Sequence, residues 1–185
     1  MSLEHAILGF LHYKPLTGYD LKAKFDASVR HFWPADQGQI YRTLSRLAEH
    51  GWTEVEVIAQ EDRPDRKVYH ITETGREELR QWLVAPLPMK GTRIAELVQI
   101  FFAGQLSDEE ILAIFRRLAE LNRQALAHLR QVQTQSACPD EQTRDCFFHL
   151  LTLEYGIYLT EANLRWFENV IARLERGEHR KGERA

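Results

Sequence analysis

The sequence has little cysteine and no long apolar run. It holds two cysteines in 185 residues, and the seven residues between Cys138 and Cys146 read as helical. A bridge is disfavoured at this spacing, so we expect free thiols. No apolar stretch is long enough to span a bilayer, and the first residues lack a signal-peptide pattern. We therefore expect a cytoplasmic protein with no membrane partner.

A basic excess is also missing. The chain carries 24 Lys and Arg against 27 Asp and Glu, a net charge of −3. Residues 1–85 alone hold 11 Lys and Arg against 13 Asp and Glu. Nucleic-acid-binding proteins usually present a basic surface. Any DNA binding by this chain must therefore depend on a few well-placed arginines.

Motifs for catalysis and metal binding are missing as well. The eight histidines include no HExxH pair, and neither a Gly-rich phosphate loop nor a GxSxG motif occurs. Cys146 and His149 have a spacing that suits metal ligands on a helix, but they lack further ligands nearby in the sequence. We expect no enzyme, no cofactor and no metal site.

A short amphipathic helix is the most informative feature that is present. Within residues 34–52, Ile40, Leu44 and Leu47 share one face of a helical wheel. Asp36 begins the helix as a capping residue paired with Gln39, and Gly51 suits its end. The opposite face is rich in groups that bind base edges or phosphates, as in a recognition helix. Its candidate contacts are Gln39, Arg42, Ser45 and Arg46.

The elements around this helix predict a winged helix-turn-helix domain. Residues 2–13 have helical spacing, and the capping box of Thr17 and Asp20 starts a second helix to about Val29, with Tyr19 among its inward positions. Residues 53–59 and 66–72 alternate with period two and flank a polar loop, which predicts a two-stranded hairpin. Thr72 caps a helix to about residue 84. The order helix, helix, helix, hairpin, helix is that of a winged helix.

The second half is helical throughout. We expect a helix over residues 92–103, a long helix from the capping box of Ser107 and Glu110 to about Gln135, and a last helix from Pro139 to about residue 175. The predicted fold is mainly α (α+β). We divide it into a DNA-binding domain (1–85), a linker (86–91), a helical dimerisation domain (92–177) and a polar tail (178–185).

The last helix is apolar on two faces, and each face needs a partner. The helix that starts near Ser107 covers one face, and a second subunit would most simply cover the other. We therefore expect a homodimer. One predicted stripe contains Leu150, Leu153, Ile157, Leu164, Ile171 and Leu174. The other contains Phe147, Leu151, Tyr155, Tyr158, Ala162 and Trp166.

Four segments resemble the PadR family of transcriptional regulators. They are SLEHAILGFLHYKPLTGYDL, GQIYRTLSRLAEHGW, DRPDRKVYHITETGREEL and, at the start of a C-terminal dimerisation domain similar to that of the Vir-type members, LVQIFFAGQLSDEE. Many relatives carry proline where this chain has Arg42. The resemblance implies a dimeric repressor on a palindromic operator. It also implies that a small hydrophobic or aromatic effector releases some members from DNA.

Two sets of candidate site residues follow. The DNA-binding set adds Tyr41 and the wing residues Arg63, Arg66 and Lys67 to the four residues of the central helix. The effector set would line an aromatic cavity and contains Trp82, Phe101, Tyr155, Tyr158 and Trp166. For the first set, the alternative is an ordinary solvated surface. For the second, the more frequent outcome is core and interface packing.

Two other functions remain open at this point. The acidic balance of the first half would also suit a winged-helix module that binds protein partners. The aromatic residues would also suit a small-molecule sensor without strong DNA binding. Binding to promoter DNA and a tryptophan-fluorescence titration with planar aromatic compounds distinguish these alternatives.

Overall fold

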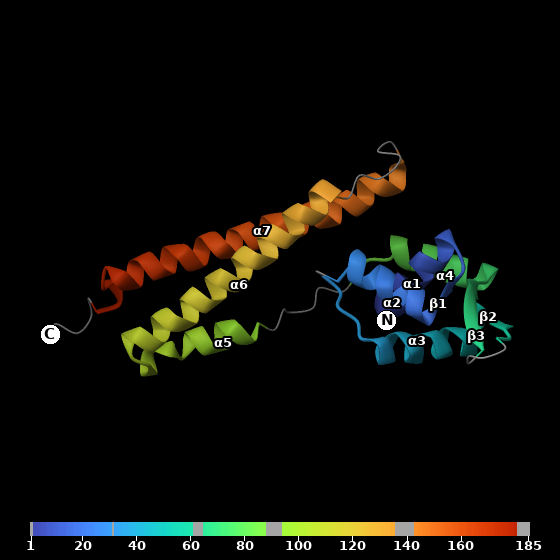
Figure 1. Cartoon of the computed structure of the whole chain (residues 1–185), viewed down its shortest axis with the longest axis horizontal. Helices are drawn as coiled ribbons and strands as arrows, with labels where there is room; N and C mark the ends of the chain where they lie inside the picture. Colours follow the sequence, from blue (N-terminus) through green and yellow to red (C-terminus); the bar gives the residue numbers. More distant parts are fainter. Residues whose placement is uncertain (1, 31, 61–64, 88–93, 136–142, 181–185) are drawn as a thin grey trace. The chain divides into compact units, whose positions relative to one another are not determined.

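The computed structural model describes residues 2–30, 32–60, 65–87, 94–135 and 143–180. The chain forms two compact units, Met1–Lys90 and Gly91–Ala185. In Figure 1 the first unit runs from blue to green and the second from yellow-green to red.

Within its described residues, the first unit contains four helices, α1 (Ser2–Tyr13), α2 (Gly18–Ala27), α3 (Gln37–Glu49) and α4 (Glu73–Val84). The predicted capping boxes at the starts of α2 and α3 are both present. Gly51 has a φ of 70°, the left-handed conformation expected of the glycine that ends α3. The helices share one core. Its fully buried side chains are Ile7, Leu8, Leu11, Leu21, Phe25, Ile40, Leu44 and Leu47.

The sheet of this unit has one strand more than the sequence predicted. Strands β2 (Thr53–Ile58) and β3 (Arg66–Ile71) form the expected hairpin, with Val55 opposite Tyr69. The short strand β1 (Leu16–Thr17) adds to the other side of β3, so the antiparallel order is β1-β3-β2. Two residues are too few to show an alternating pattern, so the sequence predicted the hairpin but not β1.

The predicted inward position of Tyr19 was wrong. Tyr19 is 71% exposed, and α2 ends at Ala27 rather than near Val29. The buried stripe of α2 runs through Leu21 and Phe25. Tyr19 precedes Leu21 by two residues, about 200° around the helix, so its side chain faces away from that stripe.

The second unit is built on two long helices that lie side by side in Figure 1. They are α6 (Asp108–Gln135) and α7 (Arg144–Glu175), accompanied by α5 (Ala95–Phe101) and short 3-10 turns at Ala103–Gln105 and Glu178–Arg180. The Ser107 capping box is confirmed: Ser107 N donates to Glu110 Oε2 at 2.9 Å, and Glu110 N donates to Ser107 Oγ at 3.3 Å. The helix predicted over residues 92–103 is shorter, and residues 92 and 93 lie outside the described part.

The pairing of α6 with α7 rests on two apolar clusters and a row of ion pairs. Leu126 and Leu129 pack against Leu153 and Ile157 in one cluster, and Phe115 and Phe167 share the other. Three arginine–glutamate pairs cross from α6 to α7 along the outside. They are Arg130–Glu161 at 2.7 Å, Arg123–Glu168 at 3.0 Å and Arg116–Glu175 at 2.9 Å.

The second predicted stripe of α7 is exposed in the single chain. Tyr155 and Tyr158 are each 64% exposed, and Phe147 is exposed as well. Leu150 of the first predicted stripe is exposed too. Among the residues that the structure describes, no helix combines the length and apolarity needed to cross a membrane.

The start of α7 and the state of Cys146 differ from expectation. The helix begins at Arg144, capped by Thr143, and the predicted start at Pro139 and Asp140 lies outside the described residues. Cys146 is buried and takes part in a disulfide, so the expectation of free thiols was wrong. It assumed that the residues between the two cysteines are helical, yet α7 begins only at Arg144, and its first turn contains Cys146. The other cysteine, Cys138, lies outside the described residues.

Candidate nucleic-acid interface

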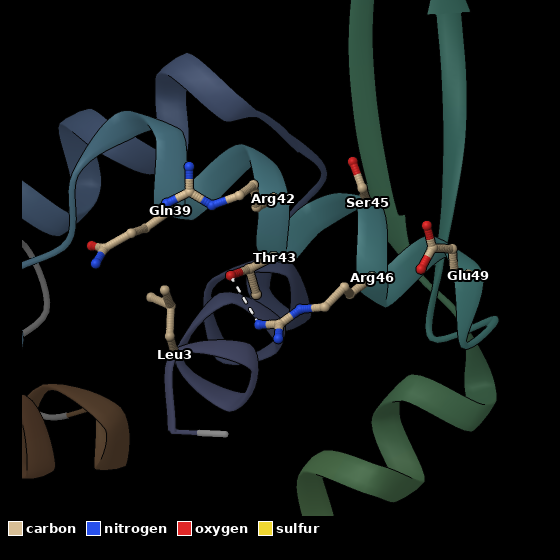
Figure 2. Close-up of a pocket in the computed structure, with 7 residues that line it drawn as sticks. All are labelled: Leu3, Gln39, Arg42, Thr43, Ser45, Arg46 and Glu49. Carbon is tan, nitrogen blue, oxygen red and sulfur yellow. Dashed lines mark hydrogen bonds between the residues drawn. The ribbon is translucent and has the colours of Figure 1, made fainter.

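Helix α3 presents one apolar face to the core and one polar face to solvent. Ile40, Leu44 and Leu47 are fully buried on the core side of α3. The opposite face borders an open hollow (Figure 2). The residues that line this hollow are Leu3, Gln39, Arg42, Thr43, Ser45, Arg46 and Glu49. The structure thus brings the four predicted α3 residues to one surface.

Two of these side chains also make local hydrogen bonds. Asp36 N donates to Gln39 Oε1 at 3.0 Å, which completes the cap of α3. The side-chain carbonyl of Gln39 serves the helix, and its amide nitrogen is the group that suits an acceptor on DNA. Ser45 Oγ donates to the carbonyl oxygen of Tyr41 at 3.2 Å.

The two arginines of the polar face have different surroundings. Arg46 Nη2 lies 3.1 Å from Glu4 Oε1 on α1, and no sequence pattern predicts this partner. No ion pair of Arg42 is found within the described part of the chain. Its Nη1 lies 3.2 Å from the place that a Cβ would take on Gly38. A bidentate contact to a guanine edge suits Arg42 better than Arg46.

Tyr41 and Arg66 both adjoin the first turn of α2. The ring of Tyr41 lies over Gly18, where a Cβ would come within 2.5 Å of Tyr41 Cε1. Arg66 Nη2, at the start of β3, lies 3.5 Å from Asp20 Oδ2. The hydrogen bond from the Thr17 hydroxyl, assisted by Arg66, holds the pKa of Asp20 below its usual value. Burial, with a contribution from Tyr41, raises the pKa of Tyr69.

The remaining predicted contacts of the wing are Lys67 and Arg63. Lys67 is exposed on β3 opposite Val57 of β2. Arg63 lies outside the described residues. Lys67 is thus positioned to contact a phosphate if β2 and β3 approach DNA.

The proposed effector residues divide between the two units. Trp82 of α4 stacks on the buried ring of His5 of α1, with ring centroids 4.5 Å apart and planes 8° from parallel. Trp166 packs edge-on to Phe115 within the second unit. The exposed residues Phe101, Tyr155 and Tyr158 belong to the second unit too. Across the described ranges, no three His, Cys, Asp or Glu side chains gather in a way that would hold a metal ion.

A three-stranded sheet packed with α1 to α4, and an α3 that exposes a polar face, define a winged-helix DNA-binding protein. Comparison with known proteins specifies the family. The model of the transcriptional regulator PadR-like family matches residues 7–81, and that of the virulence activator alpha C-terminal domain matches residues 92–175. The chain belongs to the PadR-like family of transcriptional regulators, and it is a regulator rather than an enzyme.

Three relatives span almost the whole chain. A probable transcriptional regulator of Mycobacterium tuberculosis, Rv1176c, is 30% identical over 95% of this chain and 98% of its own length. The negative transcriptional regulator PadR of Bacillus subtilis is 28% identical over 94% of this chain and 98% of its own length. The virulence activator AphA of Vibrio cholerae has a TM-score of 0.75 at 28% identity, over 94% of this chain and 98% of that one.

Two solved structures of Bacillus subtilis PadR carry ligands. The complex with operator DNA matches with a TM-score of 0.84 at 26% identity, over 94% of this chain and 99% of that one. The complex with p-coumaric acid matches with a TM-score of 0.79 at 25% identity, over 95% and 99%.

Proposed function

We propose that the chain is a dimeric repressor that binds a palindromic operator and is released by a small aromatic effector. In this proposal residues 1–85 form the DNA-binding domain and residues 92–177 form the dimerisation domain. Residues 86–91 link the two domains, and the tail 178–185 serves neither role. The protein acts in the cytoplasm.

The observation that carries the proposal is the polar outer face of α3. Gln39, Arg42 and Ser45 are all exposed there, while the residues of the opposite face are fully buried. A helix held in this way enters a major groove with its polar side chains toward the base edges. The remaining contacts with DNA are chiefly to phosphates. They would come from Tyr41, Arg46, Arg63, Arg66 and Lys67.

A symmetric dimer would account for a palindromic operator. The exposed stripe of α7, with Tyr155 and Tyr158 near its middle, is the surface that we assign to the second subunit. Two copies of α3 would then read successive major grooves about 34 Å apart. Repression is favoured by the name of the Bacillus subtilis relative, which is a negative regulator. The Vibrio cholerae relative is named an activator, so a reporter behind the bound promoter must measure the sign.

The effector part of the proposal draws on aromatic residues and on one relative. Bacillus subtilis PadR has been crystallised with p-coumaric acid. In the second unit of this chain, an aromatic effector could contact the exposed side chains of Phe101, Tyr155, Tyr158 and Trp166. An effector would have to bind the DNA-free form more tightly than the DNA-bound form, since a ligand with equal affinity for both shifts nothing.

Selection of bound duplexes from a random DNA pool tests the proposal. We expect an inverted repeat whose half-sites are one helical turn apart. A pool that converges on no sequence at moderate salt would contradict DNA recognition. It would favour the alternative that the net-acidic first half suggests, a winged-helix module that binds proteins. A single unrepeated site would contradict only the symmetric dimer.

A further inference from the structure

The ion pair between Arg46 and Glu4 joins the DNA-facing helix to α1. Arg46 Nη2 lies 3.1 Å from Glu4 Oε1 and 3.5 Å from Thr43 Oγ1. Figure 2 shows the Arg46 side chain turned toward Leu3, and so toward α1, whereas Arg42 extends toward Gln39. Arg46 is therefore oriented by a residue far away in the sequence, at the edge of the polar face.

The burial of the two partners is unequal. The side chain of Glu4 is 13% exposed and that of Arg46 is 54% exposed. A carboxylate with so little access to water needs compensating donors nearby. Arg46 supplies such donors, and the pair restricts its rotamers. A guanidinium has five N–H donors in a rigid fork, so it still presents donors on the side that faces solvent.

We propose that Glu4 is a positioning residue for DNA recognition. It fixes the guanidinium of Arg46 at the edge of α3, and Arg46 then donates to a phosphate of the operator in a geometry formed before binding. A phosphate is the partner because Arg46 is held against α1 by Glu4, at the edge of the polar face, and contacts with the DNA backbone set the register of a groove-bound helix. This inference rests on the proposed DNA-binding function.

When Glu4 is neutralised, a positioning role and a simple charge effect predict opposite changes in affinity for DNA. Glu4 and DNA are both negative. If Glu4 acted through its charge alone, neutralising it would strengthen binding to every duplex. If Glu4 holds Arg46 in place, neutralising it weakens operator binding, because the arginine must then be ordered during association.

The experiment compares variants of the full chain at one salt concentration. The probes are the duplex selected by the wild type and a scrambled duplex of equal length. We expect Glu4→Gln to bind the selected duplex roughly three- to tenfold more weakly, from the cost of ordering one long side chain. Glu49→Gln is the matched control, because it neutralises an exposed carboxylate beside the same hollow. We expect Glu49→Gln to bind both duplexes more tightly.

A double-mutant cycle separates positioning from general damage to the fold. In an Arg46→Gln background, Glu4→Gln should no longer weaken binding, since there is no guanidinium left to position. A loss of affinity through unfolding would persist in that background, and thermal unfolding of each variant detects it directly.

The possible results separate the two proposals. If Glu4→Gln binds as tightly as the wild type or more tightly, or weakens Arg46→Gln by the same factor, the positioning role is wrong and the proposed function stands. If the wild type selects no sequence, the proposed function is wrong and the positioning role is wrong with it.

Discussion

Gly75 lies directly against the carbonyl oxygen of Trp52. A Cβ at Gly75 would come within 2.2 Å of that oxygen and within 3.0 Å of Ile71 Cγ1. The same carbonyl oxygen accepts a hydrogen bond from the backbone N–H of Thr72 at 3.1 Å. Because Gly75 has no side chain, the first turn of α4 can pack directly against the backbone of Trp52, the residue that precedes β2.

Replacing Gly75 with alanine should loosen this junction. The obstructing atom belongs to the backbone and cannot rotate away, so we expect Gly75→Ala to lower the free energy of unfolding by about 1–3 kcal/mol. Thermal denaturation measures this change. Gly9→Ala is the matched control. Apart from the adjoining residues and backbone of α1 itself, no atom of the described residues lies within 4 Å of a Cβ there, and helix propensity should stabilise this variant by about 0.5–1 kcal/mol. Equal unfolding temperatures for the two variants would contradict the packing described here.

Arg42 should account for base preference at one operator position. We expect Arg42→Ala to weaken binding to the selected duplex by about 1–3 kcal/mol and to relax preference at a single base pair. Titrations of all single-base operator variants measure both effects. Lys67→Ala is the comparison. It should weaken binding to every duplex alike, and it should reduce by about one the slope of log affinity against log salt concentration. A uniform loss for Arg42→Ala would assign Arg42 to a phosphate instead.

Local patterns explain what the sequence predicted well. The capping box of Thr17 and Asp20 and that of Asp36 and Gln39 each need two residues three positions apart, and both are present. The inward face of α3 followed from helical periodicity alone, and with it the outward position of Arg42. Neither prediction required knowledge of any distant residue.

The features that were missed are long-range contacts. Leu16 pairs with Tyr69 to make a third strand, and Glu4 pairs with Arg46 across the domain. No pattern within ten residues of Glu4 signals that pairing, because it arises only when α1 and α3 pack together. Sequence therefore located the candidate DNA-binding face but did not identify which arginine on it is held by an acid.

Asp20 should make stability depend on pH in the acid range. Its pKa is lowered in the folded chain, first by the Thr17 hydroxyl and further by Arg66. A lowered pKa contributes stability above the unfolded value of about 3.9, and the contribution is lost as pH falls through the folded pKa. The effect should stay below about 1 kcal/mol, because the carboxylate is partly exposed and screened. Unfolding curves should give the wild type a higher free energy of unfolding than Asp20→Asn at neutral pH. The difference should shrink as the pH falls from about 4 through the lower pKa of Asp20 in the folded chain.

The exposed stripe of α7 should be the dimer surface. Tyr158 is 64% exposed in the single chain, so replacing it should not disturb the packing of α6 against α7. Burying an added charge in a second subunit is costly, and we expect Tyr158→Arg to convert dimers to monomers at micromolar concentration. Light scattering measures the mass.

Asn163→Arg adds the same charge to α7 at an exposed position away from both apolar stripes. It should leave the dimer intact, and it therefore separates disruption of the interface from a general effect of charge. If the wild type scatters as a monomer, the dimer itself is wrong. If the wild type is a dimer and Tyr158→Arg remains one, the second subunit docks elsewhere, and the exposed aromatic residues of α7 are then better candidates for contact with the effector.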